Sequence, residues 1–94
     1  MKVFLTRRAE RNYHSIKDYI TKEFGNKTAT TFERKADETF KLLEIFPKMG
    51  SLENNDIRGF QLSRQTRILY RIKEQKIIIL SFFDVRQDPK KRPT

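Results

Sequence analysis

Alternating polar and apolar residues identify a strand in the second half of the chain. Over Thr66–Ile72, one set of alternate positions carries polar or charged groups around a leucine, and the other set is apolar. The two sets are Arg67, Leu69 and Arg71 on one side, and Ile68, Tyr70 and Ile72 on the other. A period of two with different faces is typical of a strand that buries one side.

The next segment, Ile77–Phe83, is apolar on both faces, as in a central strand that is covered on both sides. The link at 73–76 has the length of a hairpin connection, but it has no Asn-Gly or Asp-Gly pair, so the turn type stays open. Pairing across this link places Arg71 opposite Ile78 and Arg67 opposite Phe82.

Two amphipathic helices are predicted in the first half of the chain, over Arg7–Phe24 and about Lys27–Ile45, because apolar residues recur there at spacings of three and four. Thr6 and Asn26 are the expected N-caps, and Pro47 prevents the second helix from continuing. Gly25 and Asn26 leave almost no linker, which favours an antiparallel hairpin. The inward-facing residues would be Ala9, Tyr13, Ile16, Ile20 and Phe24, then Ala29, Phe32, Ala36, Phe40 and Leu43.

The order of elements predicts an α+β fold for one domain spanning residues 1–94. An N-terminal strand at Lys2–Thr6 precedes the helical hairpin, and a polar loop at Met49–Asp56 leads into a three-stranded antiparallel meander that begins near Ile57. The helices would pack on one face of the sheet and leave the opposite face open for binding. Residues from about 89 onward are basic and carry two prolines, which predicts a loosely held tail.

Composition narrows the function. Without cysteine there is neither a disulfide nor a thiolate metal site, and no apolar run is long enough for a signal peptide or a membrane span, so a soluble cytoplasmic protein is expected. The net charge is +9, and residues 57–94 hold ten Lys or Arg against three acids. Such a patch suits a phosphate backbone or an acidic protein, and composition does not separate the two.

Arginines are the candidate binding groups, because mid-strand guanidinium groups need an anionic partner. A solvated Arg64 and an Arg86 that pairs with Asp84 or Asp88 are the alternatives without function, and Tyr70, Phe82 and Phe83 are expected in the core. We interpret Arg67, Arg71 and Arg86 together as functional. His14, the single histidine, is expected at the surface, and the sequence indicates no metal, no cofactor and no Gly-rich phosphate loop. The full candidate set for phosphate or partner binding is Arg58, Arg64, Arg67, Arg71 and Arg86.

At this point the order of motifs resembles the RelE/ParE superfamily of toxins from bacterial type II toxin–antitoxin modules, over nearly the whole chain. The motifs are the opening VFLT, Phe46-Pro47-x-Met49-Gly50, Arg67-Ile68-Leu69-Tyr70-Arg71-Ile72, Ile77-Ile78-Ile79-Leu80 and Asp84-x-Arg86-Gln87-Asp88-Pro89. The long helical hairpin and the Pro47–Gly50 turn look closer to the ParE branch.

Two functions follow from the resemblance. ParE-like members poison DNA gyrase by binding, and are not enzymes in their own right. RelE-like members are endoribonucleases that cut mRNA on the ribosome; Arg67 and Arg86 match two of their catalytic arginines, but Gly59 and Gln61 stand where they carry lysines, and no tyrosine follows Arg86. We favour the ParE-like function. Either function implies a cognate acidic antitoxin as partner, and a homodimer or a toxin–antitoxin hetero-oligomer as the assembly.

Overall fold

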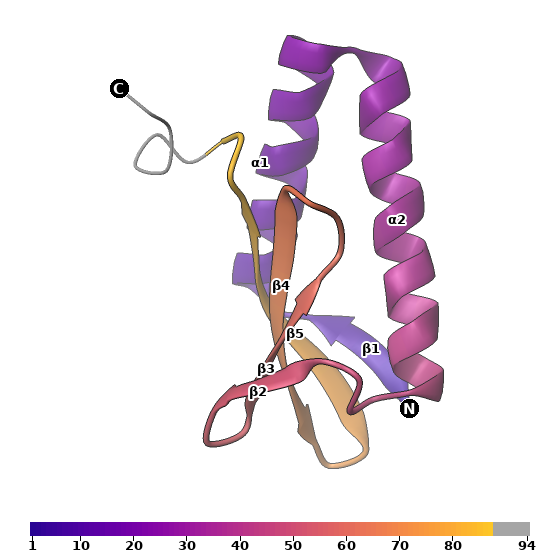
Figure 1. The fold of residues 1–94 in the computed structure, drawn as a ribbon, viewed down its shortest axis with the longest axis vertical. Coiled ribbons are helices and arrows are strands. Elements are labelled where there is room, and N and C mark those ends of the chain that lie inside the picture. The colour runs from indigo at the N-terminus through magenta and orange to yellow at the C-terminus, as the bar shows by residue number, and fades with distance from the viewer. Residues whose placement is uncertain (88–94) are drawn as a thin grey trace.

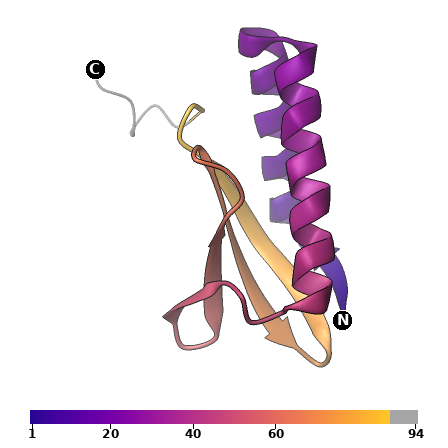
Figure 2. The same cartoon turned by 45° about the vertical axis from the view of Figure 1, so that its right-hand side comes forward.

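A helical hairpin packed on one face of a five-stranded sheet makes up the fold (Figures 1 and 2). The computed structural model describes residues 1–87, and the tail predicted from about residue 89 lies outside this range. The helices are α1 (Arg7–Phe24) and α2 (Asn26–Ile45). The strands are β1 (Lys2–Leu5), β2 (Ser51–Asn54), β3 (Ile57–Gln61), β4 (Thr66–Lys73) and β5 (Lys76–Asp84).

The predicted three-stranded antiparallel meander is part of a larger mixed sheet, with the order β1-β5-β4-β3-β2. β1 pairs in parallel with β5, and all other neighbours are antiparallel. Strand β2 lies within the segment predicted as a polar loop. Its residues are all exposed because it is the edge strand, so no apolar alternation signals it.

A β-bulge at Leu80 changes the register of β5. Tyr70 pairs with Ile79 but Leu69 pairs with Ser81, so Leu80 is the additional residue. The predicted pairing of Arg71 with Ile78 is confirmed, whereas Arg67 lies opposite Phe83 and the prediction of Phe82 was wrong. Past the bulge Phe82 is buried, and Phe83, predicted in the core, is 38% exposed on the outer face.

Side chains near the start of α1 satisfy the backbone of β5 where β1 ends. Thr6 confirms its predicted role as N-cap, since its Oγ1 accepts a hydrogen bond from the Ala9 N–H at 3.0 Å. The same hydroxyl donates to the Leu80 carbonyl at 3.1 Å, and the Asn12 side chain accepts from the Phe82 N–H at 3.2 Å. The bulge is therefore held from outside its own strand pair.

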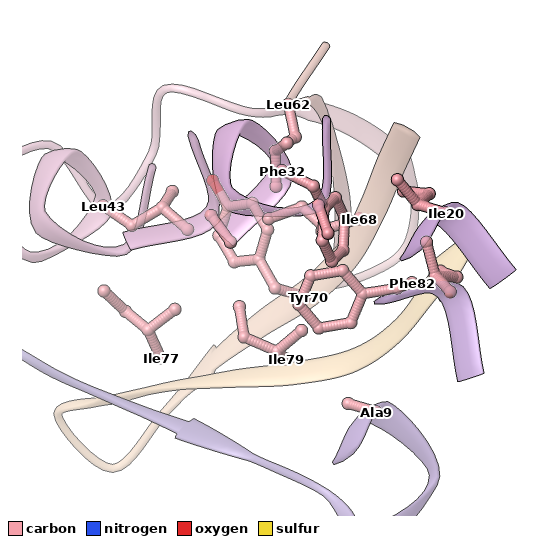
Figure 3. Packing of buried hydrophobic residues seen from close by; sticks show 13 residues of the cluster. Ala9, Ile20, Phe32, Leu43, Leu62, Ile68, Tyr70, Ile77, Ile79 and Phe82 are labelled. Carbon is pink, nitrogen blue, oxygen red and sulfur yellow. The ribbon is translucent and has the colours of Figure 1, made fainter. Parts of the chain in front are cut away.

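The core lies between the helical hairpin and the inner face of the sheet (Figure 3). α1 buries Ala9, Ile16 and Ile20, α2 buries Ala29, Phe32, Ala36, Thr39 and Leu43, and the sheet contributes Ile68, Tyr70, Ile77, Ile79 and Phe82. Two predictions were wrong. Phe24 was predicted to face inward, but it is 51% exposed because the hairpin tip extends past the sheet (Figure 1). Asn26 was predicted as the N-cap of α2, but Gly25 takes that position.

Tyr70 fastens the turn that follows α2 to the centre of the sheet. Its buried hydroxyl donates to the Pro47 carbonyl at 2.8 Å and accepts from the Gly50 N–H at 2.9 Å. A Cβ at Gly50 would lie 2.7 Å from the Tyr70 ring, so this close approach requires glycine. Tyr70 is a core residue, as predicted, and its hydroxyl is occupied.

The link between β4 and β5 is a two-residue turn, Glu74-Gln75, closed by Lys73 and Lys76. Both turn residues have positive φ, 53° and 63°, as a type I′ hairpin requires. Asn and Gly are the residues that adopt this conformation readily, which is why the sequence did not reveal the turn type.

Candidate functional site

Strand β4 presents its two predicted faces to different surroundings. Thr66, Ile68 and Tyr70 are buried under the helices, and Arg67 and Arg71 are half-buried on the opposite, outer face. No helix within residues 1–87 covers this outer face (Figure 2). The prediction that β5 is covered on both sides was therefore wrong, and its outer residues Ile78 and Phe83 flank the arginines.

Arg67 is bound by two side chains of the neighbouring strands. Its Nη2 forms an ion pair with Glu53 of β2, and its Nη1 donates to the Gln61 side-chain oxygen at 3.3 Å. The guanidinium group reaches Glu53 by crossing β3 at Gly59. A Cβ there would lie 2.8 Å from Arg67 Cζ and 3.0 Å from Glu53 Cδ, so glycine makes this path available.

Arg71 has a looser partner. Its Nε lies 3.3 Å from Asp56 Oδ2 in the turn between β2 and β3, and the Asp56 side chain is 59% exposed. The same buried Nε makes no well-directed hydrogen bond within the described part of the chain. The charge of Arg71 is therefore balanced less completely than that of Arg67.

Arg58 and Arg64 do not join these two arginines. Arg58 lies opposite Tyr70 in the sheet, and its Nη1 donates to the backbone carbonyls of Gly50 at 2.8 Å and Lys48 at 3.2 Å. It therefore supports the turn that Tyr70 also holds. Arg64 is exposed in the connection between β3 and β4, and its side chain makes no ion pair with residues 1–87, as expected of a solvated residue.

Arg86 binds the buried carboxylate of Asp84 on the helical side of the sheet. Its guanidinium group donates to Asp84 at 2.8 and 3.0 Å, its backbone N–H donates at 2.9 Å, and the Thr66 hydroxyl donates at 2.6 Å. Burial alone would raise the pKa of Asp84, but the hydrogen bonds from Arg86 and Thr66 outweigh it and hold that pKa below its usual value. The expected alternative, a pair between Arg86 and Asp84, is confirmed.

The surroundings of Arg86 separate it from Arg67. Its guanidinium carbon lies 5.7 Å from the centre of the Phe24 ring, and Arg86 helps to line a narrow cleft beside α2, of about 50 Å³. The cleft is otherwise lined by Thr28, Thr31, Phe32, Lys35, Leu62, Ser63 and Gln65. Because Arg67 points to the outer face, the two arginines do not converge on one substrate position.

The part of the chain that the structure describes offers the arginines no metal centre. Within residues 1–87, His, Asp and Glu side chains form no group of three that could hold a metal ion. His14 is exposed on α1, as predicted, and it lies in an open groove on that helix, away from the sheet. None of the helices in this range is sufficiently long and apolar to cross a membrane. The arginines of the sheet are suited to binding an anion rather than to removing a proton, because guanidinium groups are poor bases.

Sequence reasoning missed Glu53 and Asp56 as partners of the arginines, and it named Gly59 only as a replaced lysine, not as the residue that gives Arg67 its path. One signal was available: Asn55 and Asp56, between Ser51–Asn54 and Ile57, are typical turn residues and could have indicated a further hairpin.

Comparison with protein-family models identifies one family. The sequence model described as "ParE toxin of type II toxin-antitoxin system, parDE" matches residues 3–89. No curated protein matches the chain. A structure of the chromosomal ParDE system from P. aeruginosa superimposes with a TM-score of 0.75 at 24% identity, covering 89% of this chain and 95% of that one. The YoeB dimer from Staphylococcus aureus superimposes with a TM-score of 0.61 at 13% identity, covering 88% and 94%.

Proposed function

Because the chain belongs to the ParE toxin family of type II toxin–antitoxin systems, we propose that it arrests bacterial growth by binding and poisoning DNA gyrase in the cytoplasm. Membership of this family is the observation that carries the proposal, and gyrase is the target that the resemblance to the ParE branch implies. A toxin of such a module has a cognate antitoxin, and the charge of +9 favours an acidic one.

The chemistry of the sheet supports binding over RNA cleavage. Cleavage through the ribose 2′-hydroxyl requires a group that removes its proton. Arg67 and Arg86 are the arginines that match those of RelE-like endonucleases, yet they lie on opposite sides of the sheet and each is paired with a carboxylate. Gly59 and Gln61, which replace the lysines, provide the path and a hydrogen-bond partner for Arg67.

Growth arrest and its target are tested with the same induced protein. We expect induction to stop growth and raise the DNA-damage response, and co-expression of the antitoxin encoded beside it to restore growth. With purified gyrase, the protein should trap cleaved DNA, while ribosome-bound messages stay intact.

Normal growth at verified expression of folded protein would contradict the assignment as an active toxin. Codon-positioned cuts in translated mRNA, if Arg67→Ala abolishes them, would contradict the proposal that gyrase is the target. They would favour the RelE-like alternative.

A further inference from the structure

Each arginine that the sequence indicated as functional has a carboxylate partner from its own chain. Arg67 pairs with Glu53, Arg71 with Asp56 and Arg86 with Asp84. A basic protein with arginines along an open sheet face would otherwise offer a phosphate-binding surface. The acids on and beside β2 change what that face can bind.

Glu53 is placed to compete with any anion that approaches Arg67. The Glu53 carboxylate and the Gln61 side-chain oxygen accept from both terminal nitrogens of the guanidinium group. Those nitrogens are the donors that would form the paired hydrogen bonds typical of arginine and phosphate. A phosphate group must therefore displace Glu53 or approach against its charge.

The ion pair between Arg67 and Glu53 is accessible to solvent. The Arg67 and Glu53 side chains are 35% and 37% exposed, so an anion in solution can reach the pair. Gly59 lets the guanidinium group pass close over β3, and the residue opposite Arg67 on β5 is the exposed Phe83. A face with a balanced cation beside apolar groups suits a polypeptide better than a phosphate backbone.

We propose that Glu53 is a specificity-determining residue, which withholds Arg67 from phosphate and so directs the outer sheet face away from nucleic acid. Asp56 has the same effect on Arg71, more weakly, because its contact is longer and more exposed. The ion pairs of Arg67 and Arg71 support this proposal independently of whether the protein is a toxin.

Binding to a single-stranded RNA of about twenty uridines tests the proposal. Fluorescence anisotropy would compare the parent with Glu53→Gln at about 50 and 200 mM salt. Glu23→Gln is the matched control, because it removes the same charge from an exposed residue that has no ion pair within residues 1–87. We expect Glu53→Gln to bind at least about tenfold more tightly than Glu23→Gln, the factor that one charged hydrogen bond contributes.

A second substitution tests whether Arg67 is the arginine that causes the gain in RNA affinity. In Glu53→Gln/Arg67→Ala, the affinity for the RNA should return to that of the parent, which has the same net charge, and the salt dependence should lose about one phosphate contact relative to Glu53→Gln. Equal affinities of Glu53→Gln and Glu23→Gln would overturn the proposal, as would a gain that Arg67→Ala leaves intact. Because the readout is RNA binding in vitro, either result is separate from whether the protein arrests growth.

Discussion

Removal of the Tyr70 hydroxyl should destabilise the protein by a predictable amount. Tyr70→Phe keeps the buried ring but deletes the hydrogen bond to the Pro47 carbonyl, and it leaves the buried Gly50 N–H without an acceptor. One net hydrogen bond contributes about 1 kcal/mol, and a buried donor without a partner costs about 1–3 kcal/mol. We therefore expect the free energy of unfolding to fall by about 2–4 kcal/mol.

Urea unfolding and a thermal melt provide the measurement, with a melting temperature lower by about 10 °C or more for a domain of this size. Tyr13→Phe is the control, because its ring packs on Phe32 and Phe82 while its hydroxyl makes no hydrogen bond within residues 1–87. The control should stay within about 0.5 kcal/mol of the parent. Equal losses in the two variants would refute the view that Tyr70 acts through its hydroxyl.

Two further predictions concern stability. Glu74→Asn/Gln75→Gly should raise the urea midpoint by an amount equivalent to about 1–2 kcal/mol, because the new residues adopt positive φ with less strain, and a lower midpoint would contradict the turn assignment. The folded-state pKa of Asp84 is depressed, so its stabilisation is present above its unfolded pKa of about 4 and is lost as pH falls through the folded pKa. The parent should therefore lose more stability than Asp84→Asn between about pH 7 and pH 3 in urea titrations, and parallel losses would exclude this role for Asp84.

The sequence predicted those elements of the fold that are determined by residues close together in the chain. The alternation in β4 correctly separated the buried from the outer residues, and the Thr6 cap and the span of α1 followed from side-chain type and spacing. The Leu80 bulge was not predictable in this way, because its backbone groups are satisfied by Thr6 and Asn12, about seventy positions away in sequence.

The candidate site was predicted only in part for a related reason. Arg67 and Arg71 were placed on the right face, but their counter-charges lie on an edge strand whose exposed residues carry no apolar pattern. Arg58 and Arg86 were grouped with them by charge, although the register of β3 and the burial of Asp84 direct both to the helical side. The order of charges along the sequence does not reveal which acidic side chain will lie beside which arginine.

The parallel pairing of β1 with β5 constrains the order in which the sheet can assemble. Lys2 pairs with Lys76, so the first strand stays without its neighbour until both helices and the three intervening strands have been synthesised. Closing so long a loop carries an entropic cost that local contacts must first offset, and such distant pairing slows folding. We therefore expect the hairpins β2–β3 and β4–β5 to form early and β1 to join last, together with the Thr6 contacts that hold the bulge. The open edge of β5 is therefore the point at which an incompletely folded chain is most exposed to pairing with another strand.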